Sequence, residues 1–237
     1  MCKELPVSAA SPRVYVYVDG FNFYYGLYKA HRHGASPAPA GHKWLDLLKL
    51  GQAICHANAI PGTVEHVTYC TAPSLPGHND QGQARRQEVY LRALRSFPNV
   101  HVELGQHTEH PKSVRSIGSD GKAHGHPYKA MVREEKGSDV NLAAFLIRDA
   151  ALNRFDTALV LSNDSDLKMA VRITREDFGK DVIVVSPHFR QTRVARELVE
   201  AATKAFRINP ALLAGCLLPD RLQDAKGRTI FKPSDWS

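Results

Sequence analysis

Two segments of the chain place polar side chains directly after an apolar run. The run VYVYV is followed by Asp19 and, three residues later, by Asn22. The run TALVL leads into Asp164 and Asp166. Carboxylate and amide oxygens are hard ligands, which suit Mg²⁺ and Mn²⁺ better than softer metals. These residue types are therefore those of a divalent-metal site, provided that the fold brings them together.

A further acid lies in the segment EEKGSDVNLAAFLI, where Gly137 is expected to turn the chain and Asp139 to open a helix. Two like charges about 4 Å apart repel by roughly 4 kcal/mol at an effective dielectric constant of about 20. Several carboxylates in one cleft therefore require either protonation or a cation, and ordinary carboxyl pKa values of about 4 favour the cation at neutral pH. The sequence predicts a Mg²⁺ or Mn²⁺ ion held by Asp19, Asp139, Asp164 and Asp166.

Each of these residues also has a purely local structural explanation. Asp19 and the glycine that follows it suit a turn. Asp164 or Ser162 suits the N-cap of the next helix, and Ser138 or Asp139 suits the cap of the other helix, each contributing about 1 kcal/mol. Three acids at strand or helix ends that meet at one edge of the fold favour the shared site over separate caps.

Apolar runs that suit strands alternate along the chain with segments of helical period. The strand-like runs are 14–18, 64–70, 100–104, 157–161 and 181–185, and the helical segments are 44–56, 82–96, 139–152, 166–175 and 191–201. Runs such as ALVLS and VIVVS are apolar without alternation, which is typical of parallel strands buried on both faces. The pattern predicts an α/β fold, a Rossmann-like three-layer sandwich with a mostly parallel central sheet and helices on both faces. In such sheets ligands bind beyond the carboxyl ends of the strands, where the strand order reverses.

Three segments fall outside this alternation. Residues 1–12 are expected to form a flexible leader, and residues 210–237 a tail that packs on the domain without a second core. Residues 105–130 are rich in Gly, His, Pro and Lys and lack periodicity, so we expect a long mobile insertion. Its histidines leave a zinc site open, although four-histidine structural zinc sites are uncommon. They are His107, His110, His124 and His126.

The composition favours a globular protein with a polyanionic partner. Lys and Arg total 31 against 24 Asp and Glu, a formal net charge of +7, which is compatible with binding to nucleic acid. The four cysteines lie far apart without a CxxC pair, as expected for reduced thiols. No apolar run approaches the roughly 18 residues of a membrane span, and the first residues lack the core of a signal peptide. We therefore expect a cytoplasmic protein without membrane contact.

Three motifs in this order, VDGFNFYYGL, EEKGSDVNLAAFLIRDA and TALVLSNDSDL, resemble the NYN domain family of PIN-like proteins, also known as the LabA/DUF88 group. The resemblance covers residues 14 to about 187 and implies a PIN-like domain over 13–209. It also implies a ribonuclease that hydrolyses RNA phosphodiester bonds with Mg²⁺ or Mn²⁺. The catalytic residues that it implies are Asp19, Asn22, Asp139, Asp164 and Asp166, flanked by Ser162 and Ser165.

The chain departs from the family pattern at one position. Many members carry another acid six residues after the one matched by Asp139, and here that residue is Phe145. Asp149 lies one helical turn further on, too far along the axis to be assumed a substitute. The departure leaves open whether one or two metal ions bind. It also leaves open a second function, that of a catalytically weak or inactive RNA-binding module.

RNA would bind mainly through contacts of Lys and Arg with its phosphates. The candidates are Arg85, Arg86, Arg133 and Lys136, for which a solvated surface is an equally good explanation. The aromatic residues between 21 and 25 could stack on bases or pack against the sheet. The sequence does not distinguish single-stranded from structured RNA, or a monomer from a homodimer.

Other enzyme classes receive less support. The turn after the first strand, DGFN, lacks the GxGxxG spacing that lets a pyrophosphate approach the backbone. A Walker-type lysine loop is missing as well. No residue stands out as a phosphoryl-accepting nucleophile more strongly than Asp19, to which the resemblance gives a metal-binding role.

Overall fold

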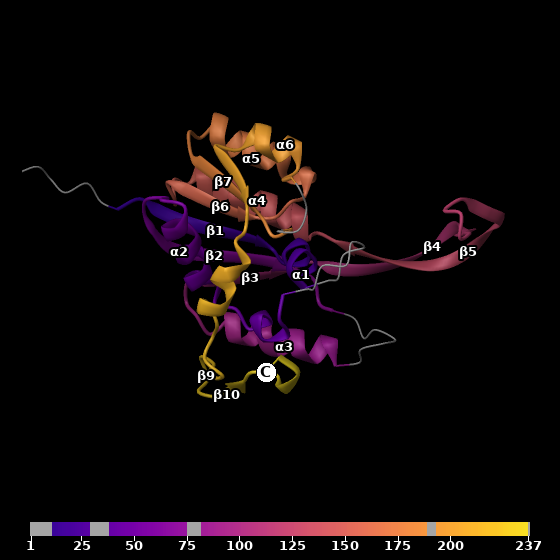
Figure 1. The fold of residues 1–237 in the computed structure, drawn as a ribbon, viewed down its shortest axis with the longest axis horizontal. Helices are drawn as coiled ribbons and strands as arrows, with labels where there is room; N and C mark the ends of the chain where they lie inside the picture. Colours follow the sequence, from indigo (N-terminus) through magenta and orange to yellow (C-terminus); the bar gives the residue numbers. More distant parts are fainter. Residues whose placement is uncertain (1–10, 29–37, 75–81, 189–192, 237) are drawn as a thin grey trace, which may run out of the picture.

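The computed structural model describes residues 11–28, 38–74, 82–188 and 193–236, and its centre is a six-stranded parallel sheet (Figure 1). The strands are β1 (Arg13–Asp19), β2 (Thr63–Thr71), β3 (Val100–Leu104), β6 (Thr157–Leu161), β7 (Asp181–Ser186) and β8 (Lys204–Arg207). Their order across the sheet is β3-β2-β1-β6-β7-β8. The predicted α/β class with a parallel sheet is confirmed.

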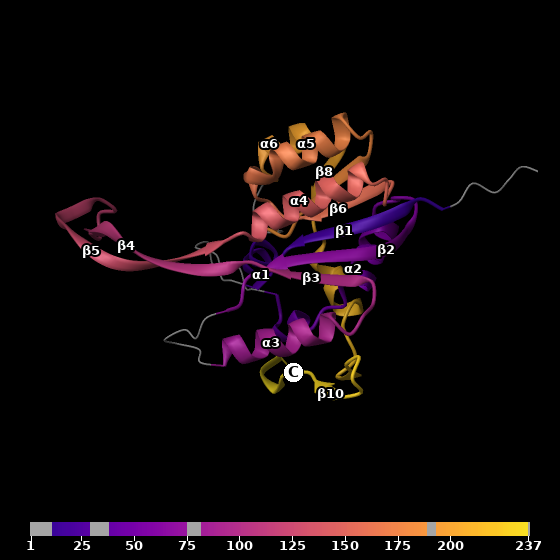
Figure 2. The same cartoon turned by 180° about the vertical axis from the view of Figure 1, so that it is seen from behind.

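Helices cover both faces of this sheet (Figure 1 and Figure 2). They are α1 (Gly20–Tyr28), α2 (Leu47–Ala57), α3 (Gln83–Leu94), α4 (Ser138–Ala151), α5 (Lys168–Glu176) and α6 (Arg196–Ala201). One apolar core includes residues of α1, α2 and α3, and a second includes residues of α4, α5 and α6. In β1, Val16 and Val18 belong to the first core and Tyr17 to the second. The strand is therefore buried on both sides, which explains its unbroken apolar run and confirms the three layers.

The strand order reverses between β1 and β6. From β1 the sheet extends through β2 to β3, and from β6 it extends through β7 to β8. Val18 pairs with Leu161, so the carboxyl ends of β1 and β6 lie side by side. Because the strands are parallel, whatever follows each of them emerges at the same edge of the sheet. This topology brings residues separated by more than a hundred positions to one place.

Within the central sheet and the helices that cover it, α1 and β8 are not predicted by the sequence. The sequence of α1, GFNFYYGLY, contains two glycines and several aromatic residues, which are poor helix formers. Its helix is supported by packing, since Phe23 and Leu27 are buried in the first core. The strand β8 is short and half exposed at the sheet edge, so it carries no apolar run. The helix expected over 191–201 is present as α6 from Arg196, and residues 191 and 192 lie outside the described residues.

The segment expected to form a mobile insertion contains a long two-stranded antiparallel ribbon, here called the arm. It consists of β4 (Gln106–Ile117) and β5 (Ala123–Lys136) and projects from the sheet (Figure 1 and Figure 2). Most of its side chains are exposed or only partly buried on both faces. A ribbon with no buried face needs no alternation of apolar and polar residues, so period-two patterning did not reveal it. Its mobility stays a prediction.

The C-terminal segment joins the first core. It contains the short helix η3 (Pro210–Gly215), the hairpin β9 (Arg221–Gln223) and β10 (Thr229–Phe231), and the short helix η4 (Ser234–Trp236). Ile230 and Trp236 are buried, and the Trp236 ring lies 6.2 Å from that of Trp44 between centroids. The segment thus packs on the domain. Residues 1–10 of the expected leader lie outside the described residues.

Among the helices in the described ranges, none is both long enough and apolar enough to cross a membrane.

Two other short helices, η1 (Ala40–Lys43) and η2 (Ser165–Leu167), connect the larger elements. The second of these follows β6 directly and contributes to the edge where the acids lie.

A buried acid, Asp149, ties α4 to β1. Its carboxylate accepts a hydrogen bond of 3.0 Å from the Tyr17 hydroxyl and forms ion pairs with Arg148 and Arg154 at 2.6 and 3.0 Å. The side chain is only 1% exposed. A buried carboxylate costs free energy unless it is paired, and here two guanidinium groups and a hydroxyl satisfy it.

We predict that Asp149→Ala lowers the free energy of unfolding by about 3 kcal/mol, because it leaves a buried tyrosine hydroxyl and two arginines without their partner. Urea denaturation measures the change. A suitable control is Glu176→Ala, which removes a half-exposed ion-pair partner of Arg175 and should cost at most about 1 kcal/mol. Equal losses for the two variants would contradict a structural role for Asp149.

Candidate metal centre

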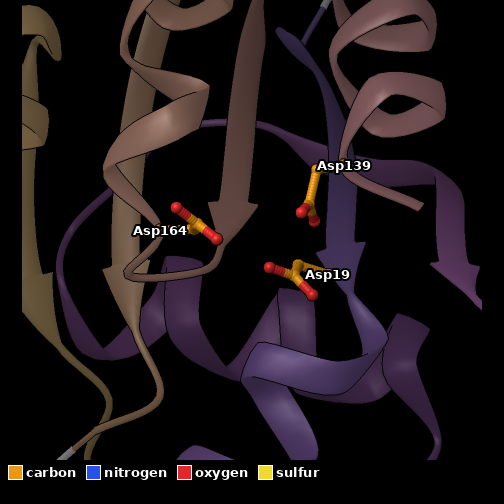
Figure 3. Close-up of side chains that lie close together, drawn as sticks. All are labelled: Asp19, Asp139 and Asp164. Carbon is orange, nitrogen blue, oxygen red and sulfur yellow. The ribbon is translucent and has the colours of Figure 1, made fainter. Parts of the chain in front are cut away.

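Three aspartates converge at the edge where the strand order reverses. Asp19 ends β1, Asp164 follows β6, and Asp139 lies in the first turn of α4. Each offers a carboxylate oxygen, and the three oxygens lie within 4.8 Å of one another. Figure 3 shows the side chains pointing toward a common space from these separate elements. The structure thus brings together three of the acids singled out in the sequence.

Asp19 is held in place by two hydrogen bonds. Its Oδ1 accepts from the backbone N–H of Asn22 at 3.0 Å, and its Oδ2 accepts from the Ser162 hydroxyl at 2.8 Å. Both donors come from the elements that follow β1 and β6, and Asp19 is 3% exposed. Gly20 is required next to it, because a Cβ there would lie 2.8 Å from side-chain atoms of Thr71 and Tyr69. The carboxylate is therefore fixed before any ligand arrives.

Asp164 has both of the roles considered from the sequence. Its Oδ1 accepts a hydrogen bond of 3.0 Å from the N–H of Asp166, so it caps the short helix η2. Its own N–H donates to the Ser162 hydroxyl at 3.0 Å, which links it to the residue that holds Asp19. Asp164 can cap the helix and belong to the acidic cluster at the same time, because a carboxylate oxygen accepts more than one interaction.

Asp139 is placed by a sharp turn between β5 and α4. Gly137 adopts φ +99°, a conformation that favours glycine, and the chain passes directly from the arm into the helix. An acid in the first turn of a helix is favoured by the exposed N–H groups there. The base of the arm therefore borders the acidic cluster.

The cluster is electrostatically unfavourable without a cation. Burial, together with the nearby charges of Asp139 and Asp164, raises the pKa of Asp19 to about 7, although its hydrogen bonds oppose the shift. Burial and the charges of Asp164, Glu135 and Asp166 raise the pKa of Asp139 to about 6. Over residues 11–28, 38–74, 82–188 and 193–236, no Lys, Arg or His forms an ion pair with any of the three aspartates. The donor set fits a hard divalent cation such as Mg²⁺.

The other two predicted catalytic residues lie beside the cluster rather than in it. Asn22 uses its side-chain oxygen to accept hydrogen bonds from the N–H of Asn163 at 2.9 Å and from the imidazole of His188 at 3.2 Å. It therefore ties the end of β1 to the loop after β6. Asp166 is exposed, and it acts on the cluster through its charge.

Two residues around the acids were not singled out in the sequence, Glu135 and His188. Together with Phe21 and Tyr25 they help to line a shallow pocket of about 220 Å³ that contains the three aspartates. Glu135 accepts hydrogen bonds from the N–H and the hydroxyl of Ser138, at 3.1 and 2.7 Å. In the sequence, Glu135 lies two residues before Gly137, where the chain turns into a helix whose first turn contains Asp139. This position is the signal that could have identified it. His188 follows β7 and lies near the acids because β7 is the neighbour of β6 in the sheet. No local sequence pattern indicates this neighbour.

Phe145 and Asp149 do not line this pocket. The Phe145 ring contacts His101 edge-on at 5.0 Å between centroids and carries the Arg148 guanidinium 4.5 Å from its centre. Asp149 is committed to Tyr17 and two arginines. The acid missing at Phe145 is therefore not replaced by Asp149.

The basic candidates for RNA binding differ in their availability. Arg86 pairs with Asp235 at 2.8 Å and its side chain is only 17% exposed. In the arm, Arg133 pairs with Glu109, and Lys136 pairs with Glu134 at 3.1 Å. Arg85 is exposed on α3. Asp235 is remote from Arg86 in the chain, and Glu109 lies opposite Arg133 in the ribbon, whereas Lys136 and Glu134 lie two residues apart on β5. The sequence could not separate these cases, because the pairings depend on the fold of the C-terminal segment and on the strands of the arm.

The four histidines of the arm cannot share one zinc ion, so this alternative is wrong. His107 pairs in register with Glu135 near the base of the arm, whereas His124 pairs with Ser116 near its tip. At about 3.4 Å per residue, these positions are on the order of 30 Å apart along the ribbon. His126 lies between the rungs of Val114 and Ser116, which is still about 14 Å or more along the ribbon from His110. A four-ligand site needs all nitrogens within about 2 Å of one ion.

The comparison with family models agrees with the motifs. The NYN domain model matches residues 13–209. The chain is 28% identical over 249 residues to 6-hydroxy-3-succinoylpyridine 3-monooxygenase HspA of Pseudomonas putida, which covers 94% of this chain and 75% of that protein. It is also similar to the crystal structure of a Vibrio parahaemolyticus protein of unknown function, with a TM-score of 0.49 and 19% identity over 90% of this chain and 99% of that one. Because the NYN domain model spans most of the chain, the protein belongs to the NYN domain family, within the PIN-like superfamily.

Proposed function

We propose that this protein is a Mg²⁺- or Mn²⁺-dependent ribonuclease that hydrolyses phosphodiester bonds at the three-aspartate site. The observation that carries the proposal is the convergence of three carboxylate oxygens within 4.8 Å at the switch point of the sheet. The NYN domain match and the formal net charge of +7 support a nuclease that acts on a polyanion. RNA, rather than DNA, comes from the family resemblance.

In this proposal Asp19, Asp139 and Asp164 hold the ion. A divalent metal ion supplies a Lewis acid for the phosphate and lowers the pKa of a water that can attack it. The chain itself contributes orientation, because Ser162 and Asn22 fix Asp19. Asp166 stands exposed at the rim, where it can accept a hydrogen bond from a water at the site.

A second function in the same fold is favoured by Phe145. The ring occupies the position where many family members carry another acid, so the site has fewer ligands for a second ion. This favours a protein that binds RNA but cleaves it weakly or not at all.

The printed name of the Pseudomonas relative describes a monooxygenase that acts on 6-hydroxy-3-succinoylpyridine. An aromatic-lined cavity beside the acids is the observation in this chain that would suit a pyridine ring. Such a reaction consumes O₂ and two electrons from a donor such as NADH. The turn after β1 lacks the GxGxxG spacing that would bind a dinucleotide donor of this kind. We therefore place RNA hydrolysis first and test oxygenation directly by O₂ consumption with that pyridine and NADH.

A first prediction concerns metal binding and pH. The pKa of Asp19 is raised to about 7 and that of Asp139 to about 6, from an unfolded value of 3.8. Between the unfolded pKa of 3.8 and the folded pKa values of about 6 and 7, the folded protein holds protons that the unfolded chain has released. The metal-free protein should therefore lose stability as pH rises from about 4 to 7. Mg²⁺ binds the ionised carboxylates and should raise Tm more at pH 8 than at pH 5.5. Thermal melts with and without Mg²⁺ measure both effects.

The matched variant for these melts is Asp19→Asn. It removes the buried charge, so in EDTA at pH 8 it should be more stable than the wild type. It should also lose the response to Mg²⁺. A wild-type Tm that does not respond to Mg²⁺ or Mn²⁺ at either pH would contradict the metal site.

A second prediction concerns catalysis. Purified protein with labelled single-stranded RNA and Mn²⁺ or Mg²⁺ should give fragments, and EDTA or Asp19→Asn should abolish them. Asp166→Asn should slow cleavage by about 10- to 100-fold, as expected for a residue that acts from beside the ligands. Product analysis on denaturing gels gives the rates.

A control for the acid variants is Asp181→Asn, which alters an exposed carboxylate at the start of β7, at the opposite edge of the sheet. It should cleave at the wild-type rate. RNA that is bound but never cut, with either metal, would leave the RNA-binding module as the function. O₂ consumption dependent on the pyridine would instead favour oxygenation.

A further inference from the structure

A second cavity lies next to the acidic pocket and is walled mainly by aromatic rings. We call it the aromatic pocket. Its volume is about 70 Å³, several times the space that one water needs. Its aromatic walls include Phe21, Tyr24, Tyr25, Tyr28, Tyr90 and Trp236.

The aromatic pocket and the acidic pocket share a wall. Phe21 and Tyr25 line both cavities. They lie one turn apart on α1, and their rings are stacked with centroids 6.1 Å apart and planes within 14°. Asp19 immediately precedes Gly20, which also lines the aromatic pocket. A molecule with its charged part at the three aspartates would therefore have this cavity as its nearest apolar space.

Two of the aromatic walls are held in place by hydrogen bonds to the backbone. The hydroxyls of Tyr28 and Tyr90 donate to the backbone carbonyls of His42 and Leu45. Phe23 also lines the pocket and is buried in the core. Tyr25, which lines both cavities, is 36% exposed. A site of this kind loses little freedom when a flat ligand enters.

Polar and cationic groups stand among the rings. The Lys43 ammonium lies 5.4 Å from the centre of the Tyr24 ring and 5.8 Å from that of Tyr28. The side chains of Ser74 and Gln83 also line the cavity. These groups suit a ring that carries hydrogen-bonding atoms at its edge and is attached to an anion, rather than a plain hydrocarbon.

We propose that the aromatic pocket holds an unpaired nucleobase of the RNA strand whose phosphate lies at the three aspartates. The inference rests on the proposed function, and it names the feature of the substrate that this chain reads. Aromatic side chains stack on bases of single-stranded RNA, and a nucleobase is the flat polar ring that a phosphodiester backbone carries. Duplex RNA keeps its bases stacked inside and cannot present one to this pocket.

The test measures binding without turnover. Asp19→Asn protein in EDTA is titrated with a labelled oligouridylate and with an abasic ribose-phosphate strand of the same length. Tyr25→Ala in this background should weaken oligouridylate binding about tenfold, the effect of losing one stacking contact, and should leave the abasic strand unchanged. Phe178→Ala is the matched control, because Phe178 is 37% exposed and precedes β7 at the opposite edge of the sheet.

Tryptophan fluorescence provides a second readout. The chain contains two tryptophans, and Trp236 lines the pocket while Trp44 lies beside it. Oligouridylate should quench their emission and the abasic strand should not. Because Tyr25 is partly exposed, its replacement should leave Tm close to that of the parent, and this is measured in parallel.

The outcomes separate this inference from the proposed function. Base-dependent binding and quenching without cleavage of RNA by the wild type would retain the pocket and reject the ribonuclease. Equal affinities of the parent and Tyr25→Ala proteins for oligouridylate would overturn the pocket, even if RNA is cleaved. Quenching by the free ring of pyridine-3-carboxylate, with none by oligouridylate, would also overturn the nucleobase assignment.

Discussion

Mutual repulsion among three carboxylates is the constraint on which the functional edge of this protein depends. Their oxygens lie within 4.8 Å of one another, and one of the groups is almost fully buried. At such distances like charges destabilise a fold by several kcal/mol unless protons or a cation compensate them. The raised pKa values of Asp19 and Asp139 are the protonic form of that compensation. A divalent ion is the other form, and it is the one suited to hydrolysis.

The parallel sheet supplies the rigidity that holds these charges together. Asp19 ends β1 and Asp164 follows β6, and these neighbouring strands are buried on both faces, so the two acids cannot move apart without disrupting the core. Ser162 binds both segments at once through its hydroxyl. Asp139 comes from α4, which covers one face of the sheet, and the turn at Gly137, with its positive φ, leads the chain into this helix. The unfavourable electrostatics of the site are thus offset by packing elsewhere in the domain.

The surroundings of the acids are asymmetric, and this asymmetry bears on substrate choice. The base of the arm contributes Glu135 to the lining of the acidic pocket, and α1 contributes a stacked pair of aromatic rings. The C-terminal segment closes the aromatic pocket through Trp236. The RNA strand that we propose as the substrate carries alternating anionic and aromatic groups, which would suit these surfaces.

The sequence by itself determined the class of fold and the identity of the acids. Apolar runs without alternation predicted buried parallel strands, and the acids at their ends followed from the same pattern. The sequence did not reveal α1, whose poor helix formers are held by tertiary packing, or the strands of the arm, which have no buried face. Only the tertiary structure decided that Asp166 lies beside the cluster, that Asp149 belongs to a separate ion-pair network, and that the arm histidines lie too far apart to share a metal. Distances between side chains remote in the chain depend on register and layer packing, which local residue patterns do not encode.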